Sequence, residues 1–306
     1  AVASCATAQT FPAKPLRIVV PFPAGGSFDV VARIIGQRAQ MGQNIIIENR
    51  PGGGTVIGTE FVSRQPADGH TILSIGPSFT TLHAMLSKVP FDTDKDFRPV
   101  GQIMGLAMAV AVNPSVPAKT MKEYIALAKA RPGEISYGTS GPIGSHAMLG
   151  ESLKRTQKIN LVHSPFQGEA PAVTAAAGGH VSGVLVNLFS IAPFVKSGRL
   201  RGLAVTSAKR SEIAPDLPPM AEAGNLPGYE VQGWYAVFAP AGTPRRIVQA
   251  INSELDQYVK SPEGRAKLLS IGLTSTGGAV NAFADYYRRE TERWVRVIRG
   301  AGIKND

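Results

Sequence analysis

Two glycine-rich turns contain the residue types that could do chemistry in this chain. The first is Pro23-Ala-Gly-Gly-Ser-Phe-Asp29, and the second is Thr139-Ser-Gly-Pro-Ile-Gly-Ser-His146. Glycine lets a ligand approach the backbone amides closely, and the first amides of a helix lack intrahelical acceptors and carry about half a positive charge. A helix after each turn would therefore make both turns suitable for binding an anion. The alternative is that these glycines only form tight turns.

Three other kinds of chemistry fit the sequence poorly. Gly52 to Gly58 has the spacing G-x-G-x-x-x-G, and no acidic residue closes a strand about 20 residues later, which argues against a dinucleotide site. Gly138-Thr-Ser-Gly141 is followed by Pro142 where a nucleophile elbow needs glycine. The histidines lack the spacing of a metal site; they are His70, His83, His146, His163 and His180.

Short apolar strands and amphipathic helices alternate around both turns. The β-branched run 14–21 predicts a strand before the first turn, and helical spacing of Val30, Val31, Ile34 and Ile35 predicts a helix after it. A strand at 135–137 and a helix around 148–153 flank the second turn. Further strands are expected at 44–48, 71–75, 106–112, 181–186, 203–206 and 234–239. This pattern predicts an α/β fold in which mainly parallel sheets are covered by helices.

The order of elements also predicts two lobes. The chain ends in helices after a late strand at 234–239, which suggests that the C-terminal part returns to the first lobe. We therefore expect residues 11–112 plus 234–306 in lobe 1 and residues 113–233 in lobe 2, with 1–10 as an export-signal remnant or disordered N-terminus. If the lobes face each other, the two glycine-rich turns would bind opposite ends of one anion.

Three helix starts carry capping signals. Ser27 or Asp29 can cap the first helix, because each offers an oxygen to free amides. Thr120-Met-Lys-Glu123 has the form of a capping box. Thr243-Pro244 predicts a capped helix start with proline in the first turn.

Composition limits the possible partners. The 306 residues are 43% hydrophobic and carry a formal net charge of +10, which suits anionic partners. No apolar run reaches the length of a membrane span. Nucleic acid is not expected as a partner, because most basic residues are scattered along the chain. One C-terminal helix carries a group of arginines mixed with Glu290 and Glu292, which is typical of a solvated helix face. These arginines are Arg288, Arg289, Arg293, Arg296 and Arg299.

The first nine residues suggest export. Ala6-Thr7-Ala8 has the A-x-A form of a signal-peptidase site, with Gln9 as the first mature residue. Two alternatives remain open: Val2-Ala3-Ser4-Cys5 resembles a lipoprotein box, which would make Cys5 a lipid attachment point, or the segment is a cloning scar. Cys5 is the single cysteine, so no internal disulfide can form.

Several segments together resemble the tripartite tricarboxylate transporter receptors, also called Bordetella uptake gene (Bug) receptors. The resemblance spans residues 11–304 and is carried by the segment 11–26 with Asp29, and by 48–52, 67–71, 96–100 and 238–244. It implies an exported periplasmic protein with the type II binding-protein fold: two α/β lobes, a ligand cleft between them, and closure on a carboxylate. It also implies that the first turn binds a carboxylate through amides and ordered water.

The glycine-rich turns and the resemblance together predict a set of ligand-binding residues from both lobes. They are Phe22, Ala24, Gly25, Gly26, Ser27, Phe28, Asp29 and Ser78 in lobe 1, and Thr139, Ser140, Gly141, Gly144, Ser145, His146, Phe166, Gly168 and Asn187 in lobe 2. Phe28, Phe79, His83 and Phe166 could surround an aromatic ring, although core packing would explain them equally well. Gln167 and Asn187 stand where many family members carry Lys and Asp, which disfavours an amino-acid ligand.

The predicted function is capture of a small aliphatic or aromatic mono- or dicarboxylate and its delivery to the membrane subunits of a transporter. We expect a periplasmic monomer that is not an enzyme and uses no cofactor or metal. Two alternatives are an α/β enzyme acting on an anionic substrate and a sensor input module.

Overall fold

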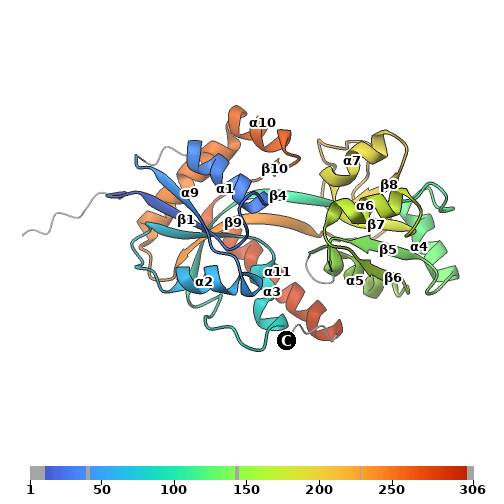
Figure 1. The fold of residues 1–306 in the computed structure, drawn as a ribbon, viewed down its shortest axis with the longest axis horizontal. Coiled ribbons are helices and arrows are strands. Elements are labelled where there is room, and N and C mark those ends of the chain that lie inside the picture. The colour runs from blue at the N-terminus through green and yellow to red at the C-terminus, as the bar shows by residue number, and fades with distance from the viewer. Residues whose placement is uncertain (1–10, 39–41, 142–144, 228, 302–306) are drawn as a thin grey trace, which may run out of the picture. The chain divides into compact units, whose positions relative to one another are not determined.

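The chain forms two compact units, described by a computed structural model over residues 11–38, 42–141, 145–227 and 229–301 (Figure 1). Unit 1 comprises Ala1–Ile103, Tyr235–Gly264 and Thr276–Thr291. Unit 2 comprises Met104–Trp234, Arg265–Ser275 and Glu292–Asp306. The N-terminal segment with Cys5, expected as an export-signal remnant, lies outside the described residues.

The two units differ from the expected lobes at four places. Residues 104–112, 234, 265–275 and 292–301 group with unit 2 and not with the first lobe. The reason is that two strands and two helices each contribute to both units: β4 (Phe97–Val112), β9 (Gln232–Pro240), α10 (Pro262–Ser270) and α11 (Val280–Ala301). Hydrophobic spacing along the chain predicts the elements but does not show that a helix such as α11 changes unit within its length.

Unit 1 is built on strands in the order β2-β1-β3-β9. β1 pairs in parallel with β2 and β3, and β3 pairs antiparallel with β9. Figure 1 shows these strands between α1 and α9 on one side and α2 and α3 on the other. Besides those already given, the elements are β1 (Leu16–Val20), α1 (Ser27–Arg38), β2 (Ile45–Asn49), the 3-10 helix η1 (Gly53–Thr55), α2 (Val56–Ser63), β3 (Thr71–Ile75), α3 (Ser78–Met85) and α9 (Arg245–Lys260).

Unit 2 is built on strands in the order β4-β7-β5-β6, with β8 and β10 also paired to β4. β5 is parallel to β6 and β7, whereas β4 is antiparallel to β7 and β8. Besides those already given, the elements are α4 (Met121–Ala130), β5 (Ser136–Thr139), α5 (Ser145–Gln157), β6 (Val162–Pro165), α6 (Glu169–Ala177), β7 (Gly183–Asn187), α7 (Leu188–Lys196), β8 (Arg201–Val205), α8 (Met220–Ala223) and β10 (Thr274–Ser275).

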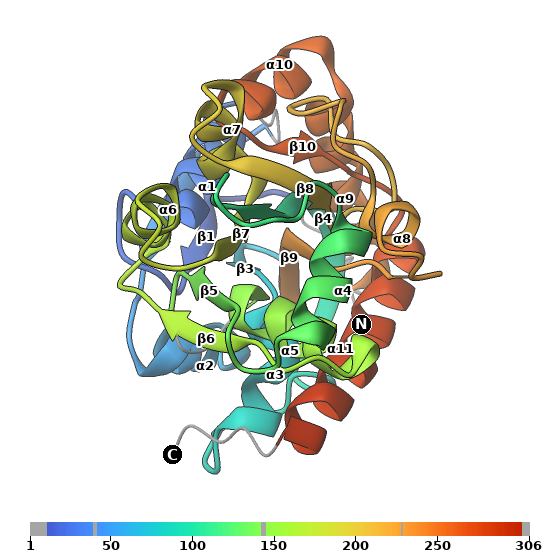
Figure 2. The ribbon, with the colours of Figure 1, turned by 90° about the vertical axis from the view of Figure 1, so that its right-hand side faces the viewer.

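Strand alternation gives unit 2 two separate hydrophobic cores. Met108, Val110 and Val112 of β4 belong to one core, which also holds buried residues of α4 and α5. Ala109 and Ala111 belong to the other core, with residues of α6 and α7. Figure 2 shows these two helical layers on opposite sides of the strands. Successive side chains of a strand point to opposite faces, so a continuous apolar run is required where both faces are covered.

A bulge in β8 adjusts this alternation. Val110 pairs with Ala204, but Ala111 pairs with Gly202, so Leu203 is the extra residue on β8. Leu203 and Ala204 both belong to the core with α4 and α5, as expected when two consecutive residues of a bulged strand share one face.

The capping predictions have different outcomes. Thr120 accepts a hydrogen bond from the Glu123 amide at 3.1 Å, as predicted, and the Glu123 carboxylate accepts from the Lys119 amide at 2.7 Å. The prediction for Thr243 is wrong: Pro244 occupies the cap position of α9, and the buried hydroxyl of Thr243 has no hydrogen-bond partner among the described residues.

Candidate functional site

In unit 1, two adjacent parallel strands end beside the predicted residues. β1 and β3 pair in parallel, so their carboxyl ends lie at the same edge of the sheet. β1 leads into the turn before α1, and β3 leads through Gly76 and Pro77 into α3, which begins at Ser78. The structure thus brings Ser78 and the first glycine-rich turn to one edge of unit 1. Of Ser27, only the backbone is described.

The turn before α1 is closed by the carboxylate of Asp29. The Gly25 amide donates to Asp29 Oδ2 at 2.8 Å, and Arg33 Nε donates to the same oxygen at 3.0 Å. Arg33 Nη2 also donates to Asn49 Oδ1 at 3.2 Å, and Asn49 Nδ2 donates to the Phe22 carbonyl at 3.2 Å. Asn49 ends β2, so this network connects the turn to the neighbouring strand.

Asp29 is ionised in this setting. Its side chain is almost fully buried, and burial alone would raise its pKa. Hydrogen bonds from Arg33, the Gly25 amide and Asn49 outweigh burial and hold the pKa of Asp29 below its usual value. A buried carboxylate that already accepts a turn amide repels a second anion. Asp29 therefore shapes the turn. The Gly26 amide donates to the Pro23 carbonyl at 3.4 Å, so the amides of residues 27 and 28 are the ones placed to meet an anion.

Aromatic rings lie beside this turn. Phe22 and Phe28 stack at 4.1 Å between ring centroids, and Phe28 lies 3.8 Å from the ring of Tyr235 in β9. Phe22 and Phe28 are partly exposed, so they can contact a ligand.

The other two rings considered for unit 1 serve in packing. Phe79 is 1% exposed and packs in the core of unit 1 against Phe97 and Phe238. His83 is exposed, accepts from the Thr93 amide at 3.4 Å and packs against Phe91.

Ser78 provides an unpaired polar atom at the same strand ends. Its hydroxyl is buried and has no hydrogen-bond partner among the described residues. A buried hydroxyl without a partner costs free energy. Ser78 Oγ is thus available to a ligand at the N-terminus of α3.

In unit 2, three parallel strands end beside one another. β5 pairs in parallel with both β7 and β6, so Asn187, Ser140 and Phe166 come at or just after neighbouring carboxyl ends. The Phe166 amide donates to the Thr139 carbonyl at 3.0 Å, and the Gly168 amide donates to the Ser140 carbonyl at 3.1 Å. These backbone bonds hold the turns after β5 and β6 together. Gly144 lies outside the described residues.

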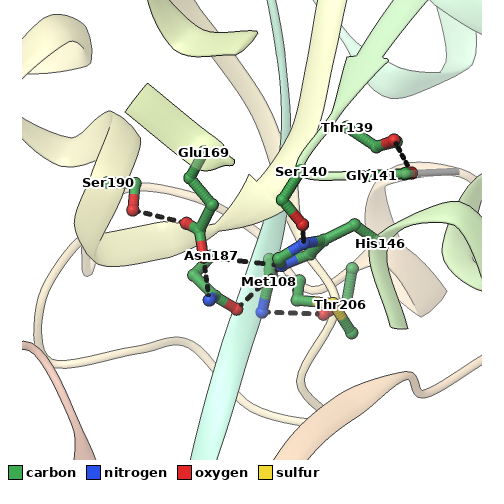
Figure 3. A network of polar contacts seen from close by, with 9 residues as sticks. All are labelled: Met108, Thr139, Ser140, Gly141, His146, Glu169, Asn187, Ser190 and Thr206. Atoms are coloured by element: carbon green, nitrogen blue, oxygen red, sulfur yellow. Dashed lines mark hydrogen bonds and ion pairs between the residues drawn. The ribbon is translucent and has the colours of Figure 1, made fainter. Parts of the chain in front are cut away.

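A chain of polar contacts runs through this edge of unit 2 (Figure 3). Ser140 Oγ lies 2.6 Å from His146 Nδ1, and His146 Nε2 lies 3.1 Å from Asn187 Oδ1. Asn187 Nδ2 donates to Glu169 Oε1 at 2.5 Å, and Ser190 Oγ donates to Glu169 Oε2 at 2.5 Å. Ser140, His146 and Asn187 were predicted site residues, and the structure brings them together.

Thr139 takes part in a second set of contacts. Its hydroxyl donates to the Gly141 carbonyl at 2.7 Å and lies 2.6 Å from His163 Nε2. Thr139 is fully buried, and burial chiefly lowers the pKa of His163. Thr139 therefore stabilises the turn from its buried side. Of the two neighbouring residues Thr139 and Ser140, Ser140 is the one that is partly exposed.

Phe166 packs within its own unit. Its ring would lie 3.1 Å from a Cβ placed on Gly138, so the glycine of β5 makes room for the ring. Phe166 is partly exposed and packs against the core with α6 and α7.

Sequence reasoning missed several residues that position the predicted ones. In unit 1 these are Arg33, Asn49 and Tyr235; in unit 2 they are His163, Glu169 and Ser190. The i,i+4 spacing of Asp29 and Arg33 was a usable signal for one of them. No local pattern connects Glu169 to His146.

Two kinds of feature are absent from the described residues. No group of three His, Cys, Asp or Glu side chains there could hold a metal ion. Within the same residues, every helix is too short or too polar to cross a bilayer.

Comparison with known proteins gives the family. The model of the tripartite tricarboxylate transporter family receptor matches residues 31–303. The protein BugT of Bordetella pertussis is 33% identical over 99% of this chain and 94% of its own length.

Solved structures agree with this match. The chain is 33% identical to R. palustris Rpa4515 with adipate, with a TM-score of 0.78 over 96% of this chain and all of that one. It is 28% identical to MatC from Rhodopseudomonas palustris with bound malate, with a TM-score of 0.72 over 94% of this chain and all of that one. The predicted binding-protein fold is confirmed by these relatives. The chain belongs to the tripartite tricarboxylate transporter receptor family.

Proposed function

We propose that this protein captures a small carboxylate, with dicarboxylates as the first class to test, and delivers it to the membrane subunits of a tripartite tricarboxylate-type transporter. The observation that carries the proposal is that each unit presents helix N-termini and hydroxyls at the carboxyl ends of adjacent parallel strands. Such strand ends are where α/β proteins bind anions. Two relatives with the same fold carry adipate and malate.

The proposed contacts come from both units. In unit 1 they are the amides of residues 27 and 28 and the unpaired hydroxyl of Ser78, with Phe22 and Phe28 beside them. In unit 2 they are the hydroxyls of Ser140 and Ser145 and the start of α5. Asp29, Thr139 and Asn187 hold these groups in place. We place the protein in the periplasm, as a monomer.

A titration of the purified protein tests the proposal. Isothermal calorimetry with adipate, malate, benzoate and an uncharged control, adipamide, should give saturable binding for at least one carboxylate and none for adipamide. A bound ligand should also raise the melting temperature. Absence of binding for every carboxylate at millimolar concentration would contradict the proposal.

One contact also suits a different function. A serine hydroxyl 2.6 Å from a histidine nitrogen, as for Ser140 and His146, can act as a nucleophile and its base, so the enzyme alternative is worth testing. Proton NMR of adipate or monomethyl adipate incubated with the protein should show no change in either compound if the protein is a receptor. Hydrolysis of the ester that Ser140→Ala abolishes would favour the enzyme.

A further inference from the structure

We propose that carboxylate binding takes up one proton at His146, which makes this histidine the residue that sets the ligand class accepted by Ser140. The inference rests on the proposed function. It follows from the hydrogen-bond directions along the chain from Glu169 to Ser140, which can be assigned one group at a time.

Glu169 fixes the orientation of Asn187. An ionised carboxylate only accepts hydrogen bonds, and Glu169 accepts from Ser190 Oγ at one oxygen and from Asn187 at the other. The amide nitrogen of Asn187 must therefore face Glu169, and its oxygen faces His146. The reverse orientation would place the amide oxygen against the carboxylate.

Asn187 in turn fixes the tautomer of His146. Asn187 Oδ1 is an acceptor 3.1 Å from His146 Nε2, so Nε2 must carry a hydrogen. In the neutral ring Nδ1 then has only a lone pair. This contact is buried, since His146 and Asn187 are each 8% exposed. The backbone of Asn187 is also held, because it pairs with Met108 in β4 and Met108 is bonded at both its amide and carbonyl by Thr206.

The charge on His146 then decides what Ser140 can offer a ligand. With a neutral ring, the Ser140 hydroxyl must donate its hydrogen to Nδ1, 2.6 Å away, and it shows a ligand only lone pairs. A carboxylate has no hydrogen to give and is repelled by those lone pairs. With a protonated ring, Nδ1 donates to Ser140 Oγ, and the hydroxyl hydrogen is free to bond a carboxylate. The positive ring also attracts the anion.

The surroundings of His146 favour this switch. Glu169 Oε1 lies 4.0 Å from Nε2 and supplies a negative charge on the far side of the ring from Ser140. Two further titratable residues lie on β5 and β6. Burial chiefly raises the pKa of Tyr137 in β5, so its hydroxyl stays neutral, and burial chiefly lowers the pKa of His163 in β6. On α5 itself, Glu151 is paired with Lys154 at 2.8 Å. Among the described residues, Glu169 is therefore the charged group beside the ring. Histidine is the side chain whose charge ordinarily changes between pH 5 and 8.

Calorimetry measures the proton directly. Adipate or malate is titrated into the protein at about pH 7 to 8.5, well above the pKa of about 4 that is usual for carboxyl groups, in buffers of different ionisation enthalpy. The dependence of the binding heat on the buffer should give uptake that approaches one proton per adipate at the higher pH. The dissociation constant should rise by up to about tenfold per pH unit in the same range.

Variants assign the proton to His146. His146→Gln should bind with no proton uptake and a flat pH profile, because glutamine does not titrate. His180→Gln is the matched control, because His180 is an exposed histidine of the same unit. Proton uptake on adipate binding to this variant should equal that of the wild-type protein. Uptake that persists in His146→Gln would overturn the proposal.

A measurement on the unmodified protein keeps the test independent of variant folding. Nitrogen NMR of the ring should show the neutral tautomer with hydrogen on Nε2 in the free protein at high pH, and the doubly protonated ring when adipate is bound. Adipate or malate binding without proton uptake overturns this inference and leaves the receptor function standing. If neither adipate nor malate binds at any pH, this inference and the proposed receptor function are both overturned.

Discussion

The backbone amide of Gly25 donates to Asp29 Oδ2 at 2.8 Å, so the turn before α1 is closed by a carboxylate from the helix that follows it. The same oxygen accepts from Arg33 at 3.0 Å. The turn's shape thus depends on a charge that the helix itself contributes near its positive end.

Replacing that charge should lower stability in a pH-dependent way. Asp29→Asn keeps an acceptor for Gly25 but loses the ionic bond to Arg33, so we expect a loss of about 1–2 kcal/mol at pH 7. Because the folded pKa of Asp29 is lowered, its contribution is full above the unfolded value of about 3.9 and disappears as pH falls through the folded pKa. Urea unfolding of both proteins between pH 7 and 3 should therefore show a difference that shrinks toward zero.

Asp285→Asn is the control for this measurement. Asp285 is exposed and paired with Arg288 at 2.7 Å on the surface of α11, where an ion pair contributes little. A difference as large as that of Asp29→Asn would contradict the role assigned to Asp29.

The conformation of Gly25 gives a second prediction. Gly25 has φ +81°, and a Cβ there would meet no atom within 4 Å, so Gly25→Ala adds backbone strain without a clash. Gly198 has φ +72° and equally open surroundings. Both alanine variants should lose about 1–2 kcal/mol in urea unfolding. Adipate affinity should fall only in Gly25→Ala, because Gly198 lies in the turn after α7. Equal affinities in both variants would contradict a binding role for the first turn.

Two tyrosines of one core allow a matched test of buried hydroxyls. Tyr124 and Tyr229 both belong to the core with α4 and α5. The Tyr124 hydroxyl has no partner among the described residues, whereas that of Tyr229 donates to the Leu149 carbonyl at 3.3 Å. Burial raises the pKa of Tyr229 to about 12. Tyr124→Phe should leave the free energy of unfolding unchanged or increase it, and Tyr229→Phe should lower it by about 1 kcal/mol. The reverse order in urea unfolding would show that the hydrogen-bond assignment is wrong.

Exchanging the acid and amide next to His146 gives a further test. Asn187→Asp would place a second carboxylate against Glu169, at a site where the present atoms are 2.5 Å apart, and should lower the melting temperature at neutral pH. Asn187→Asp combined with Glu169→Gln restores one acid and one amide, and should recover most of that loss. It also brings the charge closer to the ring, so proton uptake should persist to higher pH. No recovery in the double variant, measured by thermal unfolding, would argue against the assigned hydrogen-bond directions.

Much of the fold could be predicted because its signals are local. The strand, glycine-rich turn and helix around Pro23 and around Ser140 are adjacent in sequence, and a parallel α/β sheet brings such turns to its carboxyl edge. The contact between His146 and Asn187 joins residues 41 positions apart. It depends on how β5 and β7 pair, which side-chain patterns do not specify. The capping prediction for Thr243 was wrong because Pro244 occupies the cap position of α9. Thr243 therefore lies one residue before the cap.

The central strand β4 limits how this chain can vary in length. Its odd- and even-numbered residues between 108 and 112 serve two different cores. Adding or removing one residue there would exchange valine and methionine for alanine against both helical layers at once. The chain absorbs an extra residue in β8 instead, at Leu203. Insertions and deletions compatible with folding are therefore expected at a bulged strand such as β8 and in the connections between elements, which include the loops at the strand ends.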